Sequence, residues 1–243
     1  MNINEIITEA EYTKERSAKE LFEWMTLKYE EMSKWSADNP KLKYTVLNKG
    51  LPKKFIFELI PFAYYANNYY SGNSKVMFKP CSGSEQYDGI IIDNANKAFV
   101  EITYAVDGKI SGLQDELLMK TGHSPWEHNI LGVKDNKTKR KRSVNDIIIS
   151  EDSPPHTVII DKIKTTVKTA ISEKCKKSLE QTLPYQQNKT ILIGTFNNTV
   201  VRPSINKKDW NYFVTFKQTE IDSMEHNFIK IILFGWIDRS FID

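Results

Sequence analysis

The stretch YDGIIIDNANKAFVEITY, residues 87–104, decides the fold. It predicts two short strands joined by a tight turn, because isoleucine, valine and aromatic residues favour strands while asparagine favours turns. Each predicted strand carries a carboxylate in apolar company. Asp88 opens the first strand, and Glu101 stands between Val100 and Ile102 in the second. These two acids are the sharpest chemical signal in the chain.

An unpaired carboxylate in a packed strand is costly, so such a group is normally neutral, paired or bound to a metal. Asp88 and Glu101 face each other across the predicted hairpin and can converge on one cation. Mg²⁺, or Mn²⁺ in its place, prefers oxygen ligands, so this pair predicts a metal site. Thr103 leaves the same face of the strand as Glu101 and reaches the same site. A purely structural alternative stays open, in which Asp88 caps a turn and Glu101 pairs with a lysine-rich helix.

The segment before the hairpin predicts mainly helices. Thr8 and Glu11 have the spacing of a capping box, which predicts a long helix over about residues 8–36. Residues 51–70 predict a second helix that Pro61 should kink or split, and this helix carries Glu58 in apolar company. The expected strands of this part lie at residues 41–47 and 75–79.

Beyond the hairpin, helical and strand patterns alternate. We expect helices over residues 111–121, 157–179 and 209–217, a hairpin over 130–149, and buried strands over 189–195 and 228–237. The aromatic and β-branched residues of 209–217 also suit a strand. This alternation indicates a single α/β domain, residues 1–243, in which helices flank a mixed β-sheet.

The hairpin and its flanks resemble the PD-(D/E)XK nuclease superfamily, which has the restriction-endonuclease-like fold. The matching residues are Asp88, Glu101 and Thr103, with Glu58 as the upstream acid. The resemblance covers a core of about residues 51–195, preceded by the N-terminal helix and followed by a C-terminal extension of about 197–243. It implies a Mg²⁺-dependent endonuclease in which Asp88 and Glu101 hold the metal. The chain departs from the family at Thr103, because the family pattern is Glu-x-Lys, and Lys97 or Lys174 are possible substitutes.

Two basic segments suggest contact with a nucleic-acid backbone. The run KTKRKR, residues 137–142, contains Lys139, Arg140, Lys141 and Arg142, and the predicted helix over 157–179 carries a lysine face that includes Lys174. Cationic side chains that neutralise phosphates release counterions and so favour binding. The alternative is that both segments are simply solvated. His123 and His128 fit polar loop positions, although a metal or general-base role is also open to them.

Composition sets the remaining limits. With 40% hydrophobic and 12% aromatic residues, the chain can fill a core, and its net charge of +3 is too small to dictate a partner. Cys81 and Cys175 do not form a disulfide framework or a zinc pattern, which predicts a cytoplasmic protein. We expect no secretion signal and no membrane span.

The sequence therefore predicts a nuclease with DNA favoured over RNA as the substrate, in phage defence or mobile-element biology. The alternative is a catalytically inactive module on the same fold that binds nucleic acid or a protein partner. A homodimer is compatible with either prediction.

Overall fold

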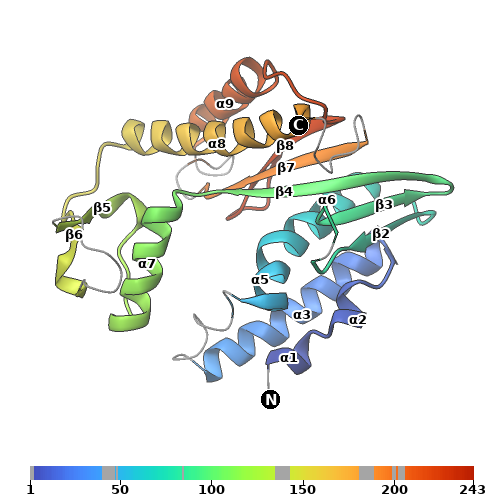
Figure 1. Cartoon of the computed structure of the whole chain (residues 1–243), viewed down its shortest axis with the longest axis horizontal. Helices are drawn as coiled ribbons and strands as arrows, with labels where there is room; N and C mark the ends of the chain where they lie inside the picture. The colour runs from blue at the N-terminus through green and yellow to red at the C-terminus, as the bar shows by residue number, and fades with distance from the viewer. Residues whose placement is uncertain are drawn as a thin grey trace.

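The computed structural model describes residues 3–39, 47, 49–83, 85–134, 143–180, 189–198, 201 and 206–243. Within these residues the chain forms an α/β structure with one mixed seven-stranded sheet in the order β1-β2-β3-β4-β7-β8-β9 (Figure 1). The strands are β1 (Arg16–Ser17), β2 (Val76–Pro80), β3 (Gly89–Asp93), β4 (Asn96–Ala105), β7 (Thr190–Phe196), β8 (Lys230–Gly235) and β9 (Phe241–Ile242). A separate two-stranded sheet joins β5 (Ile130–Val133) to β6 (Ile147–Ile149).

Helices cover both faces of the large sheet (Figure 1). One face packs against the N-terminal helices α1 (Ile3–Ile6), α2 (Glu9–Tyr12), α3 (Ala18–Asp38), α5 (Gly50–Lys54) and α6 (Ile60–Tyr70). The other face packs against α8 (His156–Leu179) and α9 (Lys207–Phe216). The helix α7 (Gly108–Thr121) lies apart with β5 and β6 and shares a small apolar core with them.

The sheet changes from antiparallel to parallel pairing at β4. Strands β1 to β4 pair in antiparallel fashion, whereas β4 pairs with β7 and β7 with β8 in parallel. Strand β7 is buried at all of its positions, as expected for the continuous apolar run in its sequence. Its side chains alternate between the two layers, with Ile191 and Ile193 toward the N-terminal helices and Leu192 toward α8 and α9.

The predicted hairpin over residues 87–104 is confirmed as β3 and β4, with a shorter turn than expected. The predicted strands over 75–79 and 189–195 and the helices over 111–121 and 157–179 are also present as β2, β7, α7 and α8. The predicted strand over 228–237 corresponds to the shorter β8, and β9 was not predicted. The predicted strand over 41–47 and the tip of the hairpin over 130–149 lie largely or wholly outside the described residues.

The single N-terminal helix predicted over residues 8–36 is wrong. Thr8 and Glu11 do form a capping box, but the helix that they start ends at Tyr12. A second capping box, made by Ser17 and Glu20, starts α3 after the short strand β1. The break occurs because Ser17 offers its side chain to a new helix N-terminus, which competes with continuing the first helix.

The helix predicted over residues 51–70 keeps its direction through Pro61 by a local change of pitch. Residues Phe55–Leu59 form a π-helical turn, and the Ile60 N–H donates to the Phe55 carbonyl. Proline lacks the N–H that a regular helix would use at Pro61, and the wider turn before it accommodates that loss. Glu58 lies in this π-helical turn, and such turns occur frequently at functional sites.

Gly89 allows α6 to pack directly on the hairpin. A Cβ atom at Gly89 would lie 2.7 Å from two ring carbons of the buried Phe62. Because the ring is rigid and enclosed, Gly89→Ala should destabilise the fold by about 1–3 kcal/mol. Urea denaturation monitored by circular dichroism measures this change.

The matched control is Gly112→Ala in α7, where an added Cβ meets nothing within 4 Å. Because alanine favours helix interiors over glycine, this substitution should stabilise the protein by about 0.5–1 kcal/mol. Equal stability of the Gly89→Ala variant and the native protein would contradict the packing argument.

Candidate functional site

Asp88 is held against β4 on both sides of Glu101. Its backbone N–H donates to the Val100 carbonyl at 2.9 Å. Its carboxylate Oδ2 accepts a hydrogen bond from the Ile102 backbone N–H at 2.7 Å. Val100 and Ile102 are the two neighbours of Glu101 in the chain, so these bonds bring the two acids of the predicted site together. The backbone carbonyl of Asp88 also accepts a hydrogen bond from the Cys81 N–H, which fixes the start of β3.

The Asp88 carboxyl group lies in an environment that disfavours its charge. Burial, and after it the neighbouring acids Glu101 and Glu58, raise the pKa of Asp88 to about 7. The Ile102 hydrogen bond and the Lys174 ammonium oppose this increase without cancelling it. Asp88, Glu101 and Glu58 therefore form a cluster of acidic side chains at the start of β3, in which negative charges repel one another.

Glu101 lies in the interior of β4 and is only 7% exposed. Its Oε1 atom forms a short hydrogen-bonded ion pair with the Nζ atom of Lys174 on α8. The lysine-rich helix therefore does supply a partner for Glu101, as the purely structural alternative expected. Lys174 therefore brings a cation to Glu101, and its charge also acts on the neighbouring Asp88.

Glu58 approaches the cluster from the π-helical turn that precedes α6. Burial raises the pKa of Glu58, Lys54 offsets part of that increase, and Glu101 adds to it. The Lys54 Nζ atom lies 3.6 Å from Glu58 Oε2, one helical turn earlier. Glu58 is therefore electrostatically coupled to both Asp88 and Glu101, although it comes from a different layer of the fold.

Two grooves border the cluster and meet where β4 ends, at Tyr104 and Val106. The first has a volume of 360 Å³ and is lined by Thr103, Lys174 and Lys177 between β4 and α8. The second has a volume of 410 Å³ and is lined by Glu58, Lys53 and Phe57 on the opposite face of the sheet. Both volumes fall in the range of small-molecule and substrate sites.

No group of three histidine, cysteine, aspartate or glutamate side chains is arranged to hold a metal ion in the described part of the chain. A metal at this site would depend on Asp88 and Glu101 together with water. That number of protein ligands is usual for Mg²⁺, which keeps several waters and binds through one or two carboxylates and substrate phosphates.

The predicted basic residues have different outcomes. Lys139, Arg140, Lys141 and Arg142 lie outside the described residues. Lys97 is exposed at the turn end of β4, four residues before Glu101, so it is roughly 13 Å away along the strand and does not serve the site. Only Lys174, of the two proposed substitutes, reaches Glu101.

Part of the lysine face of α8 is engaged within the protein. Lys168 lies 2.8 Å from Glu220, and Lys164 lies 3.6 Å from the same carboxylate. Lys174, which is paired with Glu101, and Lys177 line the groove beside Thr103. Fewer lysines of α8 are therefore available to contact a nucleic acid than the sequence pattern indicates.

Several residues of the site were not predicted. Lys54 is spaced four residues from Glu58, and this spacing is the signal that would have revealed the pair. Aromatic rings gather beside the groove that contains Glu58, with Phe57 and Tyr104 centroids 5.1 Å apart and Phe57 and Trp236 centroids 6.2 Å apart. Trp236 follows β8, and no local pattern links it to Phe57.

Comparison with known proteins identifies no relative: no family model, curated protein or solved structure matches this chain. Among the described residues, no helix is both long and apolar enough to span a membrane.

Replacement of Asp88 by asparagine tests the electrostatic environment of the cluster. The raised pKa of Asp88 means that the folded protein keeps this proton to a higher pH than the unfolded chain does. This contribution to stability is fully present below the unfolded pKa near 4 and is lost as the pH rises through about 7. Asparagine carries no charge and can still accept the Ile102 hydrogen bond. Asp88→Asn should therefore stabilise the metal-free protein by about 1–2 kcal/mol at pH 8 and have little effect at pH 4.

Thermal or urea unfolding in EDTA at both pH values measures this difference. Asp93→Asn is the control, because Asp93 lies at the other end of β3 and is exposed. A destabilising effect of Asp88→Asn at pH 8 would contradict the proposed electrostatic environment.

Proposed function

We propose that this protein is a metal-dependent nuclease that hydrolyses phosphodiester bonds, with DNA as the favoured substrate. The observation that carries the proposal is the placement of Asp88 beside Glu101, with Lys174 paired to Glu101 at the edge of an open groove. Hydrolysis of a phosphodiester can use carboxylates to hold a metal ion and a cation to stabilise negative charge on the phosphate. The adjacent groove offers space for the substrate strand.

The order of elements supports the restriction-endonuclease-like fold. Helix α6 precedes three antiparallel strands, β2, β3 and β4, and α8 then leads to β7, which is parallel to β4. This is the order that the resemblance to the PD-(D/E)XK superfamily implies, with Asp88 before the middle strand and Glu101 inside the next. Helix α7 and the β5–β6 sheet are inserted between β4 and α8.

The donor atoms fit a hard divalent cation. Asp88 and Glu101 offer carboxylate oxygens, and the pKa of Asp88 is raised because its charge is poorly compensated in the metal-free protein. A bound Mg²⁺ would lower the pKa of a coordinated water and offset charge on the phosphate. Glu58 completes the acidic cluster and, through Lys54, also brings a second cation close to it.

In this proposal Lys174 supplies the positive charge that the family lysine would supply and that the neutral Thr103 cannot. Its ammonium group is charged and lies against Glu101, whereas the Thr103 hydroxyl can only position a water molecule or a phosphate oxygen. In the reaction, the water oxygen forms a new bond to phosphorus and gives up one proton to the solvent. The bond from phosphorus to the leaving sugar oxygen breaks, and that oxygen takes up a proton.

The proposal predicts Mg²⁺-dependent cleavage that depends on the cluster. Plasmid DNA, single-stranded DNA and RNA are each incubated with the protein in Mg²⁺ or in EDTA, and the products are resolved on gels. Glu101→Gln should reduce the cleavage rate at least about 100-fold, because it removes a charged ligand of the metal. Lys174→Met should reduce it at least about tenfold, and Lys174→Arg should retain more activity than Lys174→Met.

The control is Lys176→Ala, since Lys176 is exposed on the same helix and does not line the groove. Its cleavage rate should equal that of the native protein. Full activity of Glu101→Gln, or cleavage that continues in EDTA, would exclude the proposed mechanism. Circular dichroism of each variant distinguishes loss of activity from loss of folding.

The second candidate function is a non-catalytic module that binds nucleic acid or a protein partner. The ion pair between Lys174 and Glu101 favours it, because this pair compensates the buried charge without a metal. Under this alternative, an Asp88→Ala/Glu101→Ala double variant keeps normal binding. Isothermal titration should then detect no Mg²⁺ binding to the native protein, whereas Mg²⁺ binding that the double variant loses would exclude it.

A further inference from the structure

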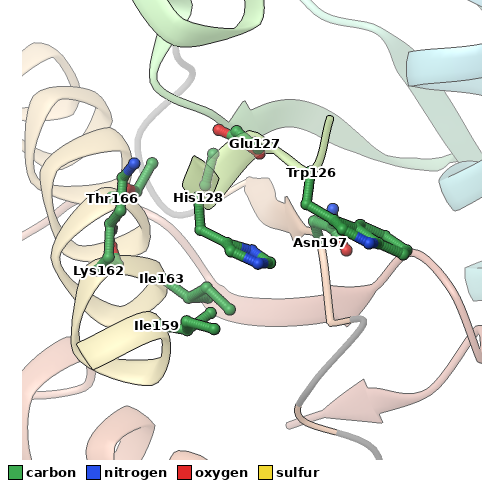
Figure 2. Close-up of a pocket in the computed structure, with 9 residues that line it drawn as sticks. Trp126, Glu127, His128, Ile159, Lys162, Ile163, Thr166 and Asn197 are labelled. Carbon is green, nitrogen blue, oxygen red and sulfur yellow. Dashed lines mark hydrogen bonds between the residues drawn. The ribbon is translucent and has the colours of Figure 1, made fainter. Parts of the chain in front are cut away.

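A pocket with an exposed tryptophan lies between α8 and the short helical turn η2 (Glu127–Asn129) (Figure 2). Asp88 and Glu101 do not line it. In this view the imidazole of His128 lies between α8 and the indole of Trp126, and Ile159 and Ile163 of α8 form the apolar side of the pocket. The cavity itself has a volume of 60 Å³. This volume corresponds to roughly two water molecules at about 30 Å³ each, so the enclosed part of the pocket is small and can admit only the edge of a planar ring.

The exposed face of the Trp126 indole forms a flat surface, which we call the platform. Its ring is nearly parallel to that of His128, with an interplanar angle of 6° and a centroid separation of 6.3 Å. This geometry is an offset stack, which orients the indole. Trp126 nevertheless remains 61% exposed, an unusual position for the largest aromatic side chain. Burial and the nearby Lys162 lower the pKa of His128, which favours an uncharged imidazole in the stack.

Polar groups surround this platform on the side of the cavity. Glu127 lines the pocket, and burial raises the pKa of its carboxyl group. Lys162 projects from α8, and Asn197 follows the end of β7. A carboxyl group and an amide can recognise the exocyclic groups of a base, and a lysine can contact a phosphate.

The pocket is connected to the proposed catalytic groove. Thr166 lines both this pocket and the groove that contains Thr103 and Lys174. Thr166 and Lys174 are eight residues apart on α8, a distance of roughly 12 Å along the helix axis. On β4, Glu101 and Ala105 are roughly 13 Å apart, and Ala105 lines the pocket. Both elements therefore place the near wall of the pocket, at Thr166 and Ala105, roughly three to four stacked nucleotides from Lys174 and Glu101.

We propose that the Trp126 pocket binds one unpaired base of a nucleic-acid strand whose backbone runs along the groove between β4 and α8. The base stacks on the exposed indole and inserts one edge toward Glu127 and Asn197. The inference deepens the proposed function and rests on it, because it assigns the substrate class: a strand with unpaired bases close to the site of cleavage. A fully paired duplex cannot reach the platform without extruding a base, which costs unstacking energy.

Binding of a fluorescein-labelled 15-nucleotide single-stranded DNA in EDTA tests the inference without cleavage. Fluorescence anisotropy gives the dissociation constant. Trp126→Ala should weaken binding about tenfold, because stacking of a base on an aromatic ring contributes at about this level, and Trp126→Tyr should restore most of the affinity. A blunt duplex of the same sequence should bind more weakly than the single strand and lose little with Trp126→Ala.

A scan of the strand with single abasic nucleotides identifies the stacked base. One position should weaken binding to the native protein about tenfold and have no further effect on Trp126→Ala, because both changes remove the same contact. Leu131→Ala is the matched control. Leu131 is 63% exposed on β5 in the same part of the fold and lacks an aromatic face, so its loss should leave binding unchanged.

The outcomes separate this inference from the proposed function. Base-dependent binding through Trp126 in a protein that does not cleave with Mg²⁺ would support the platform and exclude the nuclease. Mg²⁺-dependent cleavage with no effect of Trp126→Ala on binding would exclude the platform alone. Failure of the native protein to bind the single strand, or an equal effect of Leu131→Ala, would also overturn the inference.

Discussion

Glu101 lies inside a strand that is paired on both sides, and the compensation of its charge is the constraint on which this structure depends. Neither β3 nor β7 supplies a cation, so the partner comes from α8 in another layer. Asp88 adds a second carboxylate to the same place because its hydrogen bonds flank Glu101 along β4. One cluster of charged side chains therefore receives residues from the hairpin, from the C-terminal part of α8 and from the π-helical turn. Burial of these carboxylates costs free energy, and groups with strongly shifted pKa values are common at functional sites.

Much of the fold could be predicted because its signals are local. The hairpin over residues 87–104 has strand-forming residues on both sides of an asparagine-rich turn, and β7 is a continuous apolar run. The start of α3 was missed although Ser17 and Glu20 have the same spacing as Thr8 and Glu11, because the apolar stripe that begins at Ala18 was assigned to the first cap.

The site was only partly predictable for a related reason. Asp88 and Glu101 are visible as acids among apolar residues, so their patterns alone reveal them. The pairing of Lys174 with Glu101 joins residues 73 positions apart, and it depends on how α8 packs against β4. Trp126 and His128 became informative only with the position of α8 beside them, since in the sequence they resemble an ordinary polar loop. These contacts depend on how distant elements pack in three dimensions, which no local sequence pattern reveals.

The insertion of α7, β5 and β6 has a consequence for chain entropy. Strands β4 and β7 are parallel neighbours, yet Phe99 and its partner Thr190 are about ninety residues apart, and the inserted part accounts for roughly half of that separation. The entropic cost of closing a loop rises only with the logarithm of its length, so doubling this connection costs about 0.6 kcal/mol. The small core that α7 shares with β5 and β6 can offset such a cost by its own apolar burial. A crossover between parallel strands can therefore carry an additional recognition surface with almost no penalty to the central sheet.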